Sequence, residues 1–351
     1  MITVEFKLVP TKEQEALLHT SATEYVNCVN MLTSQIVDDP KIKLSTAHFQ
    51  AMLPSAVKNE AINAAKSVVA KFKSGTCKSL PVLRKSVITW NNQNYKIFEN
   101  TIEFPLWIDG KSKRISVIAL LTEYQSKHLV SRLGSLRITQ KNGKWIAQIA
   151  VEVPFVEPSG VNIMGVDLGL KNPAVAVVSA GSTKFFGNGR QNKYEKRKHR
   201  SKRKALGKAK KQKAIEKANN KEQRWMKDRD HKISREIVNY AEKNQVSVIH
   251  MEQLQNIRTT ARTSRKNEKN LHTWSFYRLT MFIVYKAALL GIKVEFVNPA
   301  YTSQKCPLCS RMNKAKDRKY KCVCGFKCHR DRVGAMNIIN APVVSDKRKP
   351  A

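Results

Sequence analysis

The stretch NIMGVDLGLKNPAVAVVS, residues 162–179, decides the fold class of this chain. Its first apolar run ends at Asp167 and predicts a short buried strand, and residues 174–179 predict a second strand after a turn. Downstream, the pattern repeats as strand, amphipathic helix and strand, at residues 245–252, 275–291 and 292–297. Strands that alternate with helices predict an α/β layer structure.

The N-terminal part of the chain has a different pattern. Apolar and polar residues alternate over residues 1–10, which predicts a strand. Thr11 and Gln14 have the spacing of a capping box, so we expect a helix to begin there. A second amphipathic helix is predicted after Pro54.

From about residue 80, short runs rich in Val, Ile, Trp and Thr are separated by turn residues, among them Asn142-Gly143. This pattern indicates antiparallel strands joined by hairpins. We expect a small β-barrel that includes the first strand and has the helices inserted after it. We expect three tryptophans in its core: Trp90, Trp107 and Trp145. Residues 154–160 are the predicted linker to the α/β part.

The charge of the chain indicates its partner class. Lys and Arg number 64 against 27 Asp and Glu, a formal charge of +37. A polyanion relieves such self-repulsion, so we expect nucleic acid as the partner, with a ribosomal-type binder or a membrane-surface protein as alternatives. No apolar run approaches the length of a membrane span, and the start lacks a signal-peptide pattern. We therefore expect a soluble cytoplasmic protein with no membrane partner.

Three acidic residues stand where predicted elements begin or end. Asp167 and Glu252 each end a buried strand, and Asp331 opens a short helix predicted over residues 333–340. A carboxylate at the end of a buried strand costs free energy unless it is paired or binds a cation. Carboxylates suit Mg²⁺ or Mn²⁺, and two such ions can promote phosphodiester cleavage. The alternatives are a helix N-cap at Asp331 and a salt bridge from Glu252 to a basic helix.

Five of the seven cysteines lie close together near the C-terminus. Cys306 and Cys309 have the C-x-x-C spacing that lets two thiolates share one zinc ion, whereas Cys322 and Cys324 are one residue closer together. We expect a structural Zn²⁺ held by these four residues, with Cys328 as the substitute if the C-x-C segment cannot close the site. Free buried thiols are the alternative.

Residues 193–235 are dominated by Lys and Arg in a helix-forming context. Predicted strands on both sides argue against a disordered tail, so we expect a basic helix that lies along phosphates, with a merely solvated helix as the alternative. The residues expected to bind nucleic acid are Lys196, Arg197, Lys198, Arg200, Lys202, Arg203, Lys208, Lys210, Lys211, Lys213 and Arg318.

Taken together, these residues resemble the TnpB family of transposon-encoded nucleases, to which the type V CRISPR effectors are related. The resemblance begins at FKLVPTKEQEALL and is strongest at MGVDLGLKNPAVAVV, VSVIHMEQLQNI, SFYRLTMFIVYKAALLGIKVEFVNPAYTSQKCPLC and YKCVCGFKCHRDRVGAMNI. It implies an RNase H-like (RuvC) nuclease core in which Asp167, Glu252 and Asp331 are the catalytic triad. The C-x-C knuckle is shorter than the family's usual C-x-x-C.

The resemblance also implies a domain organisation. The expected parts are a wedge-type β-barrel (1–10 and 80–160), a short helical recognition lobe (11–79), a RuvC domain (161–299 and 329–345) with a basic helical insertion (190–244), a zinc ribbon (300–328) and a tail (346–351).

Proteins of this family use an RNA guide to choose the DNA that they cut, while the protein reads a short adjacent motif. We therefore expect a Mg²⁺-dependent, RNA-guided DNA endonuclease that is associated with a transposable element in a prokaryote and has guide RNA and target DNA as partners. The alternatives are a guided repressor that does not cut, a small type V CRISPR effector, and a transposase that joins strands. The complete triad favours cutting, and the short recognition lobe favours a transposon-type protein.

Overall fold

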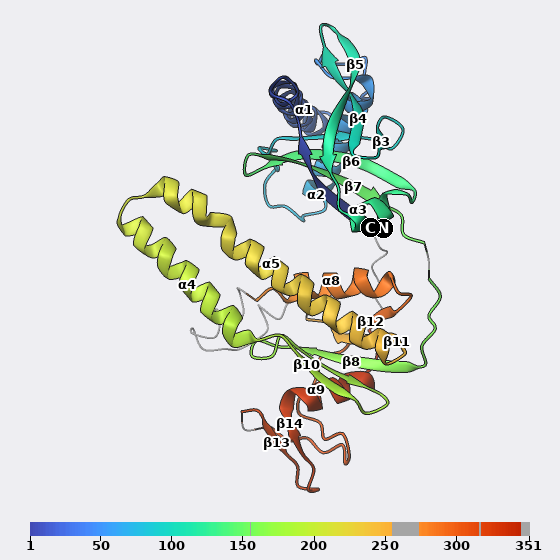
Figure 1. Cartoon of the computed structure of the whole chain (residues 1–351), viewed down its shortest axis with the longest axis vertical. Helices are drawn as coiled ribbons and strands as arrows, with labels where there is room; N and C mark the ends of the chain where they lie inside the picture. Colours follow the sequence, from blue (N-terminus) through green and yellow to red (C-terminus); the bar gives the residue numbers. More distant parts are fainter. Residues whose placement is uncertain (155, 255–273, 316, 345–351) are drawn as a thin grey trace. The chain divides into compact units, whose positions relative to one another are not determined.

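The computed structural model describes residues 1–154, 156–254, 274–315 and 317–344. The chain divides into two compact units, Met1–Val153 and Pro154–Ala351 (Figure 1). Helices and strands occur in both, so the fold is of the mixed α/β type. Among the described residues, no helix combines the length and the apolar character that a membrane crossing requires. The predicted tail, residues 346–351, lies outside the described residues.

The first unit is built on an antiparallel sheet of seven strands in the order β2-β6-β7-β1-β5-β4-β3. The strands are β1 (Ile2–Val9), β2 (Val87–Trp90), β3 (Lys96–Phe98), β4 (Thr101–Ile108), β5 (Lys111–Leu120), β6 (Leu133–Lys141) and β7 (Lys144–Val151). The helices are α1 (Lys12–Asp38), α2 (Ser55–Lys73) and α3 (Glu123–Leu129). Because β1 pairs with both β5 and β7, the N-terminal strand lies in the middle of the sheet.

Local signals place several of these elements correctly. The Thr11 hydroxyl accepts a hydrogen bond from the Gln14 N–H at 3.2 Å, and the Gln14 side chain accepts one from the Thr11 N–H at 3.1 Å, so α1 begins with the predicted capping box. Helix α2 begins directly after Pro54. The Asn142-Gly143 turn, in which both residues have positive φ, joins β6 to β7. The short elements β3 and α3 were not predicted.

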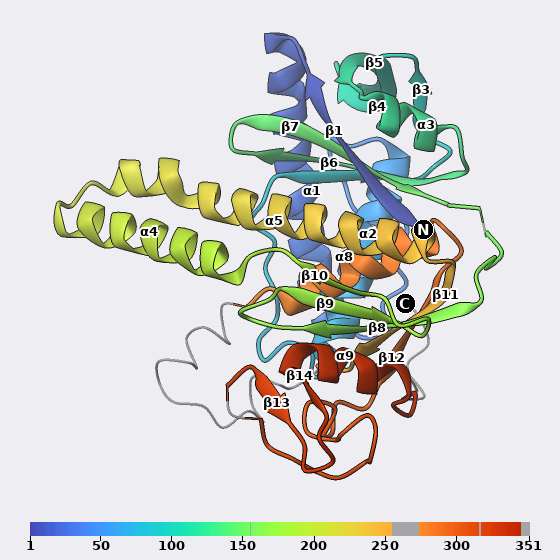
Figure 2. The ribbon, with the colours of Figure 1, turned by 60° about the horizontal axis from the view of Figure 1, so that its bottom comes forward.

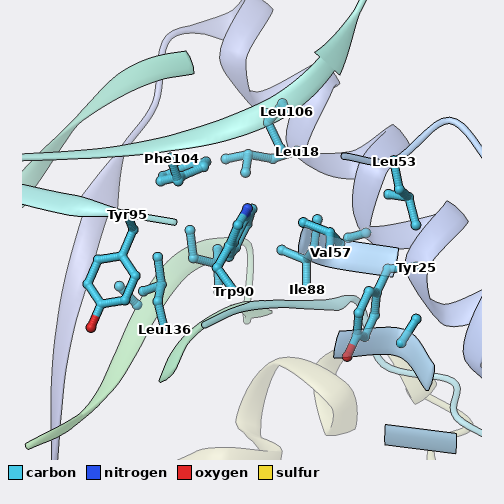
Figure 3. Close-up of a cluster of buried hydrophobic side chains, with 14 of the residues drawn as sticks. Leu18, Tyr25, Leu53, Val57, Ile88, Trp90, Tyr95, Phe104, Leu106 and Leu136 are labelled. Carbon is cyan, nitrogen blue, oxygen red and sulfur yellow. The ribbon is translucent and has the colours of Figure 1, made fainter. Parts of the chain in front are cut away.

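Trp90 lies at the centre of the core of this unit (Figure 3). It is fully buried, and its ring centroid lies 4.7 Å from that of Phe104. Its indole N–H donates to the Pro105 carbonyl at 3.0 Å, which satisfies the only polar group of the side chain. Trp145 is buried as predicted.

The prediction that Trp107 belongs to this core is wrong, because its side chain is only half-buried. Side chains on a strand alternate between its two faces. Along β4, Ile102, Phe104 and Leu106 are fully buried and take the inner positions, so Trp107 falls on the outer face.

The second unit contains a five-stranded sheet in the order β10-β9-β8-β11-β12. The strands are β8 (Asn162–Leu168), β9 (Ala174–Val178), β10 (Thr183–Phe186), β11 (Val246–Glu252) and β12 (Lys293–Val297). Strand β11 is parallel to β8 and β12, whereas β9 and β10 are antiparallel to their neighbours. Strand β10 was not predicted. The other four follow the apolar runs seen in the sequence.

Helices cover both faces of this sheet (Figures 1 and 2). They are α5 (Gln212–Lys243) and α8 (Phe276–Ala288) on one face and α9 (Arg330–Ile339) on the other. The alternate residues Met164, Val166 and Leu168 of β8 pack into the core with α5 and α8, which leaves Gly165 and Asp167 on the α9 face. The β8 sequence therefore places an acidic residue against α9.

The basic segment forms two helices rather than one. Helix α4 (Gly189–Lys208) and α5 form a hairpin that projects beyond the sheet (Figure 2), and the chain turns between them at residues 209–211. Lys210 has a φ of 53° in this turn. The sheet end of α5 is anchored by buried Ile233, Ile237 and Val238, whereas α4 has almost no buried residue and exposes most of its charged side chains.

The last segment carries a two-stranded ribbon, β13 (Lys319–Lys321) and β14 (Lys327–His329), which leads directly into α9. Helix α9 begins at Arg330, three residues before the predicted start. Its N-cap is His329, whose side chain accepts a hydrogen bond from the Asp331 N–H. The ribbon and the helix are thus continuous.

Candidate functional site

Asp167 and Glu252 end two neighbouring strands. Strands β8 and β11 pair in parallel with Val166 opposite Met251, so Asp167 and Glu252 are the next residues along each strand. Val166 and Met251 point into the core with α5 and α8. Because side chains alternate along a strand, the two carboxylates lie on the α9 face, at the same edge of the sheet.

Two glycines let α9 approach this face closely. A Cβ atom on Gly165 would lie 2.1 Å from the Ala335 carbonyl oxygen, and one on Gly334 would lie 2.9 Å from Asp167 Oδ2. No residue with a side chain fits at Gly165 without moving the helix backbone. Asp331 lies in the first turn of α9, so this approach brings a third carboxylate to Asp167. We call Asp167, Glu252 and Asp331 the carboxylate cluster.

The carboxylates of this cluster act on one another electrostatically. Burial, followed by the negative charges of Glu252 and Asp331, holds the pKa of Asp167 well above its usual range, against the opposing charges of Arg330 and Arg318. Buried like charges are costly, and a bound cation relieves the cost. Because carboxylate oxygens are the ligands that Mg²⁺ and Mn²⁺ prefer, the donor set fits a divalent ion.

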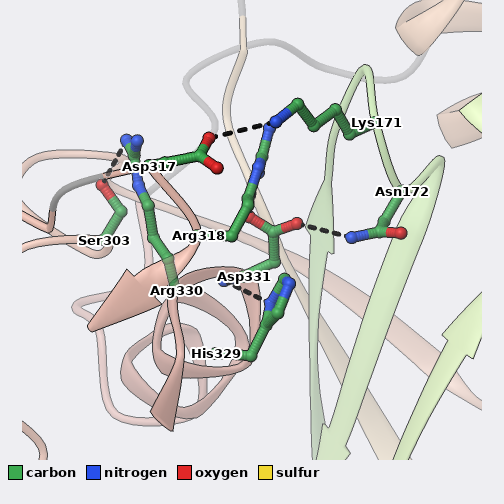
Figure 4. Close-up of polar contacts among 8 residues, drawn as sticks. All are labelled: Lys171, Asn172, Ser303, Asp317, Arg318, His329, Arg330 and Asp331. Carbon is green, nitrogen blue, oxygen red and sulfur yellow. Dashed lines mark hydrogen bonds and ion pairs between the residues drawn. The ribbon is translucent and has the colours of Figure 1, made fainter. Parts of the chain in front are cut away.

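Both oxygens of the Asp331 carboxylate have partners from other parts of the unit (Figure 4). Arg318 Nη1 donates to Oδ1 and forms an ion pair with it, and Asn172 Nδ2 donates to Oδ2 at 2.8 Å. The Asp331 N–H donates to Nδ1 of His329 at 3.2 Å. The alternative that Asp331 itself is the N-cap is therefore wrong, because that position belongs to His329 and the carboxylate points to Arg318 and Asn172.

Glu252 accepts a hydrogen bond from the loop that precedes Cys306. The Thr302 hydroxyl donates to Glu252 Oε1 at 2.5 Å. Burial raises the pKa of Glu252, and this hydrogen bond opposes the rise. Within the described part of the chain, Glu252 forms no ion pair with α4 or α5, so the alternative of a salt bridge to the basic helix finds no support.

Two further contacts tie residues 300–328 to the β8–β9 turn and to α9 (Figure 4). Lys171, in the turn between β8 and β9, forms an ion pair with Asp317 at 3.0 Å. Arg330 Nη2 donates to the Ser303 hydroxyl at 3.4 Å. These contacts surround the carboxylate cluster with positive side chains, which suits a site that meets phosphates.

Four of the cysteines form a compact group of their own, which we call the thiol cluster: Cys306, Cys309, Cys322 and Cys324. Their sulfur atoms all lie within 4.8 Å of one another. Although burial opposes it, hydrogen bonds from the backbone of Cys309 and Leu308 lower the pKa of the Cys306 thiol to about 7, which favours the thiolate that binds metal. The donor set fits a tetrahedral zinc ion.

Cys328 is not part of this group. It lies on β14 opposite Tyr320 and packs against the small core under the thiol cluster. The tight C-x-C segment nevertheless brings the sulfur of Cys324 to 3.7 Å from that of Cys306. Among the described residues, only the four cysteines of the thiol cluster form a metal-ligand group this compact, and the carboxylates are spread more widely.

The basic residues expected to bind nucleic acid do not all have the same surroundings. Arg203 forms an ion pair with Glu222 of α5 at 2.7 Å, and burial lowers the pKa of Lys196, against the charge of Glu222. Arg318 contacts the carboxylate cluster instead of open solvent. The others are exposed on the α4–α5 hairpin: Arg197, Lys198, Arg200, Lys202, Lys208, Lys210, Lys211 and Lys213.

Sequence reasoning did not single out Asn172 and Thr302, the two neutral side chains that hold Asp331 and Glu252. Asn172 stands in the turn that follows Asp167, and its position between two apolar strands was the available signal. Thr302 lies in a loop without any periodic pattern, and nothing in the sequence distinguishes it.

Two family models match the chain. One, described as a probable transposase, matches residues 147–258, and the other, described as a Cas12f1-like TNB domain, matches residues 276–338. The first match contains Asp167 and Glu252, and the second contains the thiol cluster and Asp331.

Known proteins show the same relationship. A TnpB-like protein of Methanocaldococcus jannaschii is 29% identical over 248 residues, which are 66% of this chain and 88% of that protein. The CRISPR-associated endodeoxyribonuclease Cas12f1 of Sulfoacidibacillus thermotolerans is 31% identical over 255 residues, which are 66% of this chain but only 57% of that enzyme. The resemblance to the TnpB family and its CRISPR-associated relatives is thereby confirmed.

The fold has a match among solved structures. The structure of a Cas12f1–sgRNA–target DNA complex superimposes with a TM-score of 0.70 and 18% identity, and it covers 93% of this chain and 82% of that chain. At this identity, the likeness establishes a shared mixed α/β fold.

Proposed function

We propose that this chain is an RNA-guided DNA endonuclease of the TnpB type that cuts phosphodiester bonds at the carboxylate cluster. The observation that carries the proposal is the convergence of Asp167, Glu252 and Asp331 from three elements, at the face where Gly165 and Gly334 admit α9. The relatives support it, because they include a TnpB-like protein and a named endodeoxyribonuclease.

The carboxylate cluster would hold Mg²⁺ or Mn²⁺. Such ions supply an activated water and a Lewis acid for the leaving oxygen in phosphodiester hydrolysis. The chain's own residues act on the ligands: Asn172 fixes one oxygen of Asp331 and Thr302 fixes one oxygen of Glu252, while Arg318 offsets the charge of Asp331 until an ion binds. Fixed ligands place charge where it is needed without reorganisation during the reaction.

We further propose that the five-stranded sheet with α5, α8 and α9 is the RuvC-type, RNase H-like nuclease core. The thiol cluster would hold one zinc ion and so fix the predicted zinc ribbon, residues 300–328, which includes β13 and most of β14. Thr302 and Arg318 reach the carboxylates from this segment. Four thiolates leave no open coordination position, so this zinc would be structural. In the first unit, the seven-stranded sheet would be the wedge-type barrel and the residues 11–79 the recognition lobe.

The α4–α5 hairpin would supply a phosphate-binding surface. Its exposed Lys and Arg residues have few acids near them, and such surfaces attract nucleic acid without reading its sequence. Guide RNA and target DNA are the partners that we propose. The carboxylate cluster is complete, which favours a cutting enzyme over a guided repressor.

The test is cleavage of a matched and a mismatched DNA duplex, each with and without the RNA that co-purifies with the protein, at two salt concentrations. We expect Mg²⁺-dependent cutting of the matched duplex only when the RNA is present, because base pairing selects the target. Equal cutting of both duplexes, or full activity without RNA, would show a nuclease that is not RNA-guided.

A further inference from the structure

A cavity lies beside the carboxylate cluster but is lined by none of its three acids. It has a volume of about 650 Å³ and lies between the end of β9, the loop of residues 298–310 and the C-terminal half of α9. The volume falls in the range of small-molecule sites. Its apolar wall is formed by Val177, Met336 and Ile339, which belong to one small hydrophobic cluster.

Arg332 lines this cavity with a positively charged side chain. Its Nε atom is buried and has no hydrogen-bond partner among the described residues. Because this Nε is closed to solvent, a ligand in the cavity would contact the rest of the positively charged side chain, which lines the cavity. Lys305 lines the same cavity, which makes an anion the fitting acceptor.

Tyr301 supplies an aromatic surface at the rim. Its side chain is 64% exposed, and its backbone has a φ of 61°, a conformation that costs free energy for a residue with a Cβ. The Tyr301 carbonyl accepts hydrogen bonds from the N–H groups of Gln304 and Lys305, at 2.9 and 3.0 Å, so the turn is held in place. An exposed tyrosine on a hydrogen-bonded turn offers a platform on which a base can stack.

The cavity is linked to the carboxylate cluster through shared residues. Thr302 lines the cavity, and its hydroxyl donates to Glu252. Asn337, also in the lining, donates to the carbonyl groups of Thr302 and Lys305 at 2.6 and 2.7 Å. A ligand in the cavity would therefore lie against the loop that holds a carboxylate.

We propose that this cavity binds one nucleotide unit, with its base against Tyr301 and its phosphate at Arg332 and Lys305. A free nucleoside monophosphate and a unit within a single strand share this chemistry. The inference rests on the proposed function, which supplies the DNA strand as the source of the nucleotide. A strand held here would be anchored next to the carboxylate cluster.

The test uses the full-length protein in EDTA without guide RNA, so that it does not depend on cutting. A short single-stranded DNA that contains 5-iodouracil is cross-linked by light, and the modified peptide is identified by mass spectrometry. We expect modification of Tyr301. Tyr301→Leu and Arg332→Gln should each weaken binding of the oligonucleotide about tenfold, within the range for loss of one stacked base. Tyr301→Phe should bind like the wild type.

Lys314→Gln is the matched control, since Lys314 is an exposed cation within residues 300–328 and does not line the cavity. It removes the same charge as Arg332→Gln and should change the affinity less than twofold, by the small effect of one exposed charge. If thymidine 5′-monophosphate prevents the cross-link to Tyr301, the site also binds free nucleotides. If the cross-link forms equally well in its presence, the site binds a nucleotide only as part of a strand.

Cross-links that map only elsewhere, together with unchanged affinity in Tyr301→Leu and Arg332→Gln, would overturn the inference. This failure differs from a failure of the proposed function. If the protein does not cut under RNA guidance but Tyr301 is cross-linked, the nucleotide site stands and the guided nuclease does not.

Discussion

The carboxylate cluster and the thiol cluster lie in the same unit, but they are built in opposite ways. The thiol cluster comes from two turns of one short segment, and its sulfur atoms lie within 4.8 Å of one another. The carboxylate cluster comes from β8, β11 and α9, and each of Glu252 and Asp331 is held by a side chain from elsewhere. The first is complete within its segment, whereas the second exists only when the sheet, α9 and the ribbon are assembled.

This difference would suit two ions of different kinds, one structural and one that takes part in cutting. Four thiolates in a closed group suit an ion that stays in place and stabilises the ribbon. Three spread carboxylates with an arginine among their partners suit an ion that binds and leaves. Residues 300–328 connect the two clusters, since this segment carries the thiol cluster and also Arg318, the partner of Asp331.

The largest expected effect is on cutting by a change in the carboxylate cluster. Asp167→Ala should lower the cleavage rate at least about a thousandfold, on the scale of losing a key transition-state contact, because it removes a metal ligand. Glu252→Ala and Asp331→Ala should behave alike. Binding of RNA and of target DNA should persist, as measured by gel shift, because these three residues carry no positive charge that could attract phosphate.

Asp228→Asn serves as the control for these variants, because Asp228 is an exposed acid on α5 that pairs with Lys232. It should cut at the wild-type rate. Wild-type cleavage by any of the three carboxylate variants in Mg²⁺ would remove that residue from the site.

The thiol cluster should affect stability more than chemistry. Cys306→Ser and Cys309→Ser should remove about one zinc per chain and lower the melting temperature by roughly 5–10 °C, because zinc binding is coupled to folding. Mass spectrometry of the native protein and a thermal melt measure both effects.

Three other cysteines sharpen this prediction. Cys77→Ser should leave zinc and stability unchanged, since Cys77 belongs to the first unit and is not a member of the thiol cluster. Cys324→Ser should release the zinc and Cys328→Ser should retain it; the reverse result would make Cys328 the fourth ligand.

A smaller effect is expected at Arg318, which belongs to the segment of the thiol cluster and contacts Asp331 of the carboxylate cluster. Arg318→Gln should lower the Mg²⁺ concentration for half-maximal cleavage about threefold to tenfold, because the guanidinium repels the incoming ion and competes for Asp331 Oδ1. Lys319→Gln, the adjacent exposed cation, should have little effect. A raised Mg²⁺ requirement in Arg318→Gln would show that Arg318 chiefly positions the carboxylate.

The smallest effect on chemistry is expected far from both clusters. Replacing Lys208, Lys210, Lys211 and Lys213 with Gln should weaken nucleic-acid binding about tenfold and flatten its salt dependence, because fewer counterions are released. The choice of target and the cutting of bound DNA should not change. Gln supports a helix nearly as well as Lys, so circular dichroism should be unaltered. An unchanged salt slope would exclude this end of the hairpin from the phosphate-binding surface.

The sequence alone predicted those parts of the site that depend on local patterns. Asp167 and Glu252 were found because each interrupts an apolar run at the point where a strand ends, and the four cysteines were found by their spacing. The prediction did not reach Asn172 or Thr302, because each acts on a carboxylate that is remote in sequence. The start of α9 was also missed, since its cap is His329, a residue type that seldom marks a helix start.

The carboxylate cluster should cut DNA with exchangeable divalent ions while the thiol cluster keeps its zinc. The most direct measurement is brief dialysis of the protein–RNA complex against a chelator, followed by parallel assays of zinc content and cleavage of a matched duplex. We expect about one zinc per chain to remain while cutting falls to background and returns on addition of Mg²⁺. Cutting that survives in chelator, or fails to return with Mg²⁺ while the zinc is still bound, would contradict the account.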